Sequence, residues 1–359
     1  MATLNPADLD RLVGAVQTNC HIADASHAAD LTLCIYLLQM REFYRWEQGA
    51  APLQPLPRDA VGAWIARREA LWASLEGAAF VPVPAPGLGF DRFDSFDPFD
   101  AAGVNARLCP FGLVYGAGHT RPGRACFFLG ELQHAQPRDG VELLVSGREH
   151  ARGLAAPPAA LTGSTVLLRE ESLARWVWEK FEAWTLKRQT DAFKAALDAH
   201  GYEHLGPAAV ASLIDAEGEN LVLHELGEFR AAGLLGPDWQ ALRGTQTSRR
   251  TDLYLRALRD HLADCLVTLP TLLERRADAS LHFWFANLEG VRAELFPRLA
   301  PAYAAWCGGD AGVALDAALS AGRHHWQHWC DRLLALHRVQ GADAPRHIEA
   351  ALRAPELRL

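Results

Sequence analysis

The sequence predicts an α+β fold that is mainly helical, with a small antiparallel β segment inserted after the N-terminal helices. Apolar residues recur at helical spacing before residue 79 and again from residue 170 almost to the end of the chain. Over residues 80–169, short apolar runs are instead separated by Gly, Pro and Arg-Asp-Gly turn signals. The chain has 359 residues, 50% of them hydrophobic, which is enough for a buried core and about two domains.

The first region, residues 1–79, is expected to contain helices only. Apolar spacing predicts one N-terminal helix, a break at Thr18 and Asn19, and a second helix over residues 22–46. A cluster of prolines ends the second helix. A third, amphipathic helix is expected over residues 61–75.

The second region, residues 80–169, is expected to form a small antiparallel sheet. Its most secure feature is a hairpin at residues 137–140, because Asp139-Gly140 supplies the positive φ angles of a tight turn. The expected strands cover residues 111–115, 125–129, 141–145 and 165–168.

A segment with a period of three residues lies within this region. Phenylalanine occupies positions 90, 93, 96 and 99, and aspartate occupies positions 91, 94, 97 and 100. This period is typical of polyproline II or 3₁₀ backbone, which would place the phenylalanines along one edge. The segment is then either a strap that buries its phenylalanines or a strip that binds a partner or a cation.

The third region, residues 170–359, is expected to be an all-α domain, with which the helices of residues 1–79 can also pack. The Gly and Pro residues between apolar repeats divide it into successive helices. These are expected over residues 170–200, 206–215, 218–232, 248–268, 280–292, 295–307, 311–338 and 343–353.

Charge and cysteine content exclude several classes of protein. The net charge of −8 argues against a protein that coats nucleic-acid phosphates, which requires a basic surface. We find no signal peptide and no apolar run long enough to span a membrane. Seven scattered cysteines without a CxxC pair favour reduced thiols. We therefore expect a soluble cytoplasmic protein whose partners and oligomeric state stay open.

Motifs for nucleotide and serine-hydrolase chemistry are absent from the sequence. There is no GxxxxGK[ST] loop, no GxSxG elbow and no GxGxxG after an expected strand. We therefore expect no nucleotide cofactor.

The sharpest candidate site lies in the C-terminal helices. The run from His224 to Glu228 nearly matches the HExxH zinc-protease helix, but a glutamate replaces the second histidine. Protease chemistry is therefore disfavoured. His224 and Glu228 are four residues apart, so they share one helix face and can chelate one ion.

Two further pairs with the same spacing complete the candidate metal site. Asp260 and Asp264 share one face of a second helix, and His324 and His328 share one face of a third. Arg256, four residues before Asp260, is expected to form a helix ion pair with it. If the three helices lie side by side, the six residues form a carboxylate and imidazole site that suits iron or manganese. The two Glu-x-x-His pairs of a di-iron bundle are missing, and ordinary amphipathic packing explains the same residues.

A second candidate cluster lies near the N-terminus. The residues Cys20, His21, Asp24 and His27 are all ligand types and lie within two helical turns. The alternative is structural, with an aspartate near a helix end and a histidine bonded to backbone.

The chain resembles an uncharacterised bacterial family. The resemblance rests on Asn-Cys-His-Ile-Ala-Asp-Ala at residues 19–25, on residues 36–47, and on Leu-Ala-Asp-Cys-Leu-Val-Thr-Leu-Pro at residues 262–270. It covers most of the chain, and it implies no activity, cofactor or partner.

Two hypotheses of function follow. In the first, the protein is an iron- or manganese-dependent oxidoreductase that uses the metal as a redox centre or Lewis acid. In the second, it is a non-catalytic interaction or scaffold protein that uses the β region and the Phe/Asp segment as a docking surface.

Overall fold

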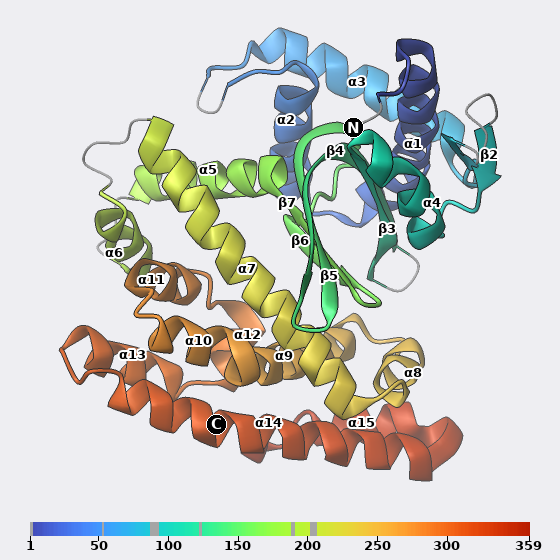
Figure 1. Ribbon diagram of the computed structural model, residues 1–359. Coiled ribbons are helices and arrows are strands. Elements are labelled where there is room, and N and C mark those ends of the chain that lie inside the picture. The colour runs from blue at the N-terminus through green and yellow to red at the C-terminus, as the bar shows by residue number, and fades with distance from the viewer. Residues whose placement is uncertain (1–2, 52–53, 87–92, 122–123, 188–190, 202–206) are drawn as a thin grey trace. The chain divides into compact units, whose positions relative to one another are not determined.

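The protein is mainly helical with a small β region, which confirms the predicted α+β class (Figure 1). The computed structural model describes residues 3–51, 54–86, 93–121, 124–187, 191–201 and 207–359. The chain divides into two compact units, Met1–Leu186 and Lys187–Leu359.

The N-terminal unit begins with three helices, of which the first is longer and the second shorter than expected, because the helix breaks at residues 28–32. They are α1 (Pro6–His27), α2 (Leu33–Glu47) and α3 (Arg58–Leu75), with the 3₁₀ turn η1 (Ala28–Asp30) between the first two. The expected break at Thr18 and Asn19 is wrong, because α1 continues through both residues. Thr18 donates to the carbonyl of Gly14 one turn earlier, at 2.8 Å. Asn19 bonds both backbone groups of Val81, so neither polar side chain competes with the helix.

A five-stranded sheet follows, with strand order β3-β4-β5-β7-β6. The strands are β3 (Leu113–Arg121), β4 (Arg124–Arg138), β5 (Val141–Arg152), β6 (Ala159–Thr162) and β7 (Thr165–Arg169). The expected hairpin is confirmed: Arg138 pairs with Val141, and Asp139 and Gly140 have φ angles of 49° and 89°. These two positive angles match the twist of the flanking strands.

The sheet is mixed rather than wholly antiparallel. β5 and β7 pair in parallel, because the short strand β6 lies between them in the chain and reverses direction before β7. The reversal occurs at Gly163, whose φ angle is 61°. The expected strands did not include β6, whose four residues are too short for a period-two pattern to be recognised.

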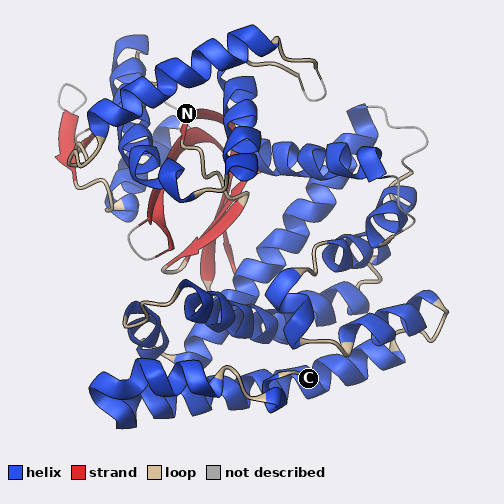
Figure 2. Cartoon of the chain, turned by 180° about the vertical axis from the view of Figure 1, so that it is seen from behind, coloured by secondary structure: helices blue, strands red, loops and turns tan. Residues whose placement is uncertain are grey.

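One hydrophobic core joins α1 to the sheet. Helix α1 packs on β4 and β5, and α4 (Ala101–Leu108) packs on β3. Figure 2 shows helices lying against this sheet. The core residues are apolar and buried, and include Leu12, Val16, Val104, Leu108, Tyr115, Phe127 and Leu129. Helix α1 and the strands therefore belong to one folding unit.

The Phe/Asp segment does not form a period-three helix where it is described. Phe93–Phe96 is strand β2, which pairs antiparallel with β1 (Val83–Pro86). Phe99 contacts the rings of Phe80 and Phe127, and Asp100 caps α4 by accepting from the backbone of Gly103. The positions Phe90 and Asp91 lie outside the described residues.

The helices α5 (Glu170–Lys187) and α6 (Ala192–Ala199) precede the C-terminal bundle. The later helices are α7 (Pro207–Leu235), α8 (Asp238–Gly244), α9 (Arg249–Ala263), α10 (Leu269–Glu274), α11 (Asp278–Ala286), α12 (Gly290–Leu295), α13 (Leu299–Cys307), α14 (Val313–Gln340) and α15 (Ala344–Ala351). The two helices expected over residues 206–215 and 218–232 form the single helix α7. The expected helix over residues 248–268 instead ends in the π-helical turn η4 (Asp264–Thr268).

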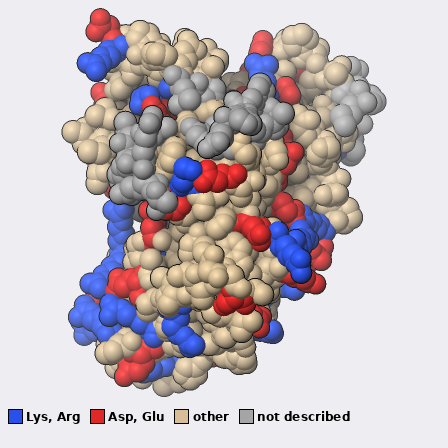
Figure 3. Space-filling view, turned by 90° about the vertical axis from the view of Figure 1, so that its left-hand side faces the viewer, with Lys and Arg blue, Asp and Glu red and all other residues tan. Residues whose placement is uncertain are grey.

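None of the described helices combines the length and apolar composition needed to cross a lipid bilayer. On the face that Figure 3 shows, Lys and Arg side chains are interspersed with Asp and Glu side chains and with large uncharged areas. The expectation that the protein does not coat nucleic-acid phosphates, which rests on its net charge of −8, stays a prediction.

The C-terminal bundle brings α7 unusually close to α9. A Cβ atom added to Gly227 would lie 2.5 Å from the carbonyl oxygen of Ala263 and 2.9 Å from its carbonyl carbon. Both atoms belong to backbone and cannot rotate away. Glycine is therefore required at this contact.

Gly227→Ala is expected to destabilise the protein by about 1–3 kcal/mol, because the two helix backbones must separate. Gly233→Ala is the matched control on the same helix, since nothing lies within 4 Å of a Cβ at that position. The control should leave stability unchanged or raise it by up to about 1 kcal/mol. Urea denaturation measures both, and equal effects in the two variants would contradict the tight contact.

Candidate metal centre

Three of the six expected ligands lie together in the C-terminal unit. His224 and Glu228 project from α7, and Asp260 projects from α9. One ligand atom from each of them lies within 4.8 Å of the other two. The side chains are 22%, 14% and 21% exposed for His224, Glu228 and Asp260. The group is therefore largely buried, with each of its side chains partly exposed to solvent.

A fourth expected residue, Asp264, holds the histidine in place. The Nδ1 atom of His224 lies 2.8 Å from Oδ1 of Asp264, a side chain that is only 1% exposed. Nδ1 therefore carries the proton of this hydrogen bond. The other ring nitrogen, Nε2, faces Glu228 at 3.6 Å.

The charges around this pair are strongly coupled. Burial would lower the pKa of His224, but Asp264 and Glu228 outweigh it and raise that pKa well above its usual value. Burial would raise the pKa of Asp264, but His224 and Arg292 hold it well below its usual range. Arg292 also donates a hydrogen bond to Asp264. In this arrangement His224 is an imidazolium between carboxylates.

The π-helical turn η4 begins at Asp264. Its closing hydrogen bond runs from the backbone N–H of Leu269 to the carbonyl of Asp264, five residues earlier. Such single π-turns inside α-helices are frequent at functional sites. Here the turn begins at the residue that orients His224.

Arg259 is the cation that faces Glu228 and Asp260, and the sequence analysis did not identify it. Arg259 donates hydrogen bonds to Glu228 and to Asp260, the latter at 3.3 Å. The expected pair between Arg256 and Asp260 is wrong, because Arg256 bonds Asp252 at 3.0 Å. Helix spacing permits either pair for Arg256, and only the packing of α7 on α9 brings Glu228 to Arg259.

The acids of the group titrate in opposite directions. Burial and the charge of Glu228 raise the pKa of Asp260, and they raise that of Glu225 to about 7. Burial opposes ionisation of Glu228, but His224 and Arg259 outweigh it and lower its pKa to about 2. Pairs of carboxyl groups whose environments separate their pKa values in this way are typical of functional sites.

His324 and His328 are not part of the group. Both are exposed on α14, and Nδ1 of His324 donates to the carbonyl of Ser320 at 2.8 Å. Helix α14 packs on α9 through Trp326. The Trp326 ring stacks on the ring of His261, with 4.9 Å between the ring centroids. Residues two positions from Trp326 lie about 200° around the helix from it, so both histidines point outward. Their expected role as ligands is wrong.

The N-terminal candidate cluster is buried, and the protein's own groups occupy three of its members. Cys20 donates to the carbonyl of Phe127 at 3.1 Å, and Arg68 donates to Nε2 of His21 at 2.7 Å. Asp24 accepts the backbone N–H of Leu154 at 2.9 Å. Burial and Asp24 raise the pKa of the Cys20 thiol.

His27 is also buried, on the last turn of α1. Among the residues that the structure describes, the four members of this cluster do not form a group of metal-binding size. The contacts of Cys20, His21 and Asp24 favour the structural interpretation.

Asp24→Asn is expected to flatten the pH dependence of stability. Burial raises the pKa of Asp24 to about 7, although the Leu154 hydrogen bond and Arg152 lower it. An unfolded aspartate titrates near pH 4, so the folded state holds an extra proton between about pH 4 and pH 7. The free energy of unfolding therefore falls as pH rises through this range, by at most about 1.4 kcal/mol per pH unit. Asparagine cannot lose that proton.

Urea denaturation at pH values between about 4.5 and 8 measures the effect as the difference between variant and parent. Glu76→Gln, at an exposed carboxylate, is the control and should leave the slope unchanged. An Asn variant with the slope of the parent would show that Asp24 is already ionised at low pH.

Two family domains account for most of the chain. Residues 11–169 match the N-terminal domain, and residues 174–355 the C-terminal domain, of a family of unknown function, DUF6866. No curated protein and no solved structure matches the chain. The boundary between the two matches falls at the end of β7. The expected resemblance to an uncharacterised family is confirmed, and the chain belongs to the DUF6866 family.

Proposed function

We propose that the C-terminal unit binds one divalent ion, iron or manganese, through Nε2 of His224 and the carboxylates of Glu228 and Asp260. The hydrogen bond from Nδ1 of His224 to Asp264 carries the proposal. Metal-binding histidines almost always use their second nitrogen in this way, which fixes the tautomer and the ring orientation.

The separations of the ligand atoms support an ion of this size. Such ions lie about 2.1 Å from nitrogen and oxygen ligands, so two ligand atoms of one ion are at most about 4.2 Å apart. The three atoms here lie within 4.8 Å of one another, so small side-chain movements are sufficient. Binding would displace the proton of Nε2 and would therefore weaken at low pH.

Arg259 would compete with the ion. It donates to two of the proposed ligands, Glu228 and Asp260, and so neutralises them. In total, four carboxyl groups (Glu225, Glu228, Asp260 and Asp264) face two arginines and His224. A divalent ion would take the place of the Nε2 proton of His224, and it requires Arg259 to turn away from its acids.

The ligand set favours redox or Lewis-acid chemistry. Carboxylates suit manganese, imidazole suits iron, and three protein ligands leave positions for water or a substrate on a six-coordinate ion. The partial exposure of all three side chains gives access to those positions. We therefore propose an iron- or manganese-dependent oxidoreductase.

Protein purified without a histidine tag is expected to contain about one iron or manganese ion per chain, measured by elemental analysis. His224→Ala and Glu228→Ala should remove it, because each deletes a ligand. Asp264→Asn should weaken affinity by about 10–100-fold, because it removes only the orienting bond.

The doubly substituted His324→Ala, His328→Ala chain is the matched control, because it loses two exposed histidines of the same unit. It should keep its metal. Circular dichroism checks that every variant is folded. Folded parent protein that takes up neither metal, or equal metal in parent and His224→Ala, would overturn the proposal.

Arg259→Met separates a metal centre from a plain ion-pair network. Without added metal the variant should be less stable, because two partly buried carboxylates lose their cation. About 1 mM Mn²⁺ should then raise its melting temperature more than that of the parent, since the ion replaces the lost charge and meets no competitor.

Arg275→Met, which breaks an exposed pair with Glu219, is the control and should respond to Mn²⁺ like the parent. Calorimetry with and without EDTA provides the readings. No extra response of the Arg259 variant to Mn²⁺ would assign the group to ion pairing alone.

One observation favours a non-catalytic interaction protein, but on α2 rather than on the β region and the Phe/Asp segment of the second hypothesis. The first turns of α2 expose apolar side chains, with Leu33 70%, Leu38 60% and Ile35 46% exposed. Exposed apolar patches often mark surfaces that bind other proteins. Metal-free parent protein whose stability does not respond to iron or manganese would favour this hypothesis.

A further inference from the structure

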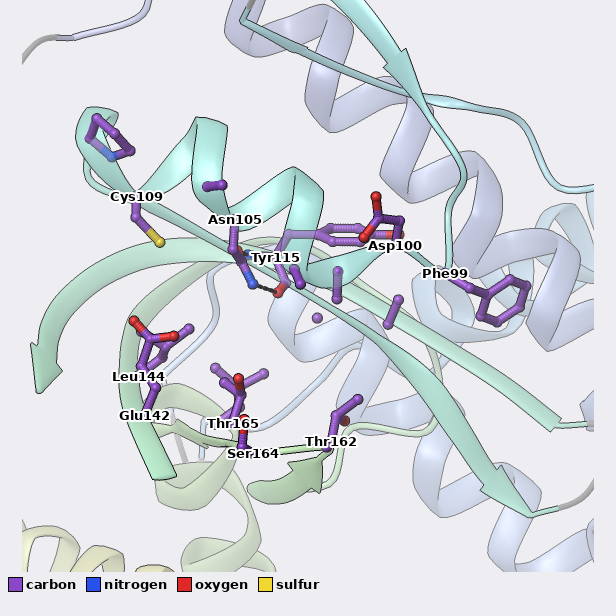
Figure 4. A pocket seen from close by; sticks show the side chains of 18 residues that line it. Phe99, Asp100, Asn105, Cys109, Tyr115, Glu142, Leu144, Thr162, Ser164 and Thr165 are labelled. Atoms are coloured by element: carbon purple, nitrogen blue, oxygen red, sulfur yellow. Dashed lines mark hydrogen bonds between the residues drawn. The ribbon is translucent and has the colours of Figure 1, made fainter. Parts of the chain in front are cut away.

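A second candidate site lies in the N-terminal unit, where the sheet curls between its two edges. The cavity measures about 720 Å³, within the usual range for small-molecule sites. Helix α4 and strand β3 form one wall, and strands β5, β6 and β7 form the other (Figure 4). A Cβ atom on Gly118 of β3 would lie 3.8 Å from Oγ1 of Thr162 on β6, so the edges approach each other at one end.

The floor and sides of the cavity are largely apolar. Leu144 and Leu167 contribute aliphatic groups, and several alanines of α4 add methyl groups. The hydroxyls of Thr162, Ser164 and Thr165 lie along the wall opposite α4 (Figure 4). Such a lining suits a molecule with a hydrocarbon body.

The charged groups of the lining all have one sign. Asp100 and Glu142 lie on opposite walls (Figure 4), and no Lys, Arg or His is present among the described lining residues. Asp100 uses Oδ1 to cap α4, which leaves Oδ2 for another donor. The side chain of Glu142 is exposed on β5.

The negative potential reaches across the cavity. Burial and the charge of Glu142 raise the pKa of the Cys109 thiol on the facing wall. The Asn105 amide, by contrast, is occupied by both backbone groups of Tyr115. The polar side chains left for a ligand are therefore the carboxylates of Asp100 and Glu142, on opposite walls, and the hydroxyls of the lining.

We propose that this cavity binds a small organic cation with amino groups at both ends, an aliphatic diamine or a short polyamine. Each ammonium group bonds one carboxylate, Asp100 or Glu142, and the methylene chain lies along the apolar floor. Anions are excluded by the two carboxylates.

Isothermal titration with 1,5-diaminopentane and with spermidine tests the proposal. Salt of about 150 mM screens weak attraction to the acidic surface. At least one of the two amines should bind with a stoichiometry of one, and 1,5-pentanediol, which has the same length and no charge, should not.

Two charge-removing variants locate the binding site. Asp100→Asn keeps the helix cap, because asparagine caps as well as aspartate, and removes only the charge. Glu142→Gln changes an exposed strand position. Each should weaken amine binding about tenfold or more, the contribution expected of a hydrogen bond to a charged group.

Glu76→Gln, an exposed carboxylate at the end of α3, is the control and should bind like the parent. Absence of amine binding, equal binding of the diol, or parent-like affinity in both cavity variants would each overturn the proposal. The metal content of the C-terminal unit plays no part in this test, so the two proposals fail independently.

Discussion

The candidate chemistry of the C-terminal unit depends on the close approach of two helix backbones. Gly227 lies against the carbonyl of Ala263, the residue directly before Asp264. Only at this distance does the buried carboxylate of Asp264 reach Nδ1 of His224. The same approach brings Arg259 to Glu228. A side chain at position 227 would act on all of these contacts together, although it makes none of them itself.

Sequence spacing predicted the local half of this site well. Residues four apart share a helix face in any α-helix, so the pairs His224 with Glu228 and Asp260 with Asp264 needed no tertiary information. Which helices meet, and by which face, is decided by packing. On α14 the tryptophan at position 326 faces the core, because its burial is worth more than that of a histidine. His324 and His328, two positions before and after it, are therefore turned to solvent.

Long-range contacts also explain why the break at Thr18 and Asn19 was wrongly predicted and why the sequence left two interpretations of the Asp24 cluster open. Thr18 and Asn19 resemble a helix end in sequence, but Asn19 finds its partners at Val81, 62 residues away. The cluster around Asp24 resembles a ligand set, but its hydrogen bonds are satisfied by Leu154, which is 130 residues away. The hairpin at Asp139-Gly140 was predictable because its conformation depends on the turn residues themselves.

The π-helical turn at Asp264–Thr268 has a consequence for how this site can change in evolution. Such a turn is an α-helix with one residue inserted, and each residue advances a helix by about 100°. The insertion lets the carboxylates before it face α7 while Leu269 and Leu272 after it stay buried. Loss of a single codon within the turn would retain every proposed ligand, yet it would rotate the leucines out of phase with the acids. Helix phase, as well as ligand identity, is therefore a property on which selection can act here.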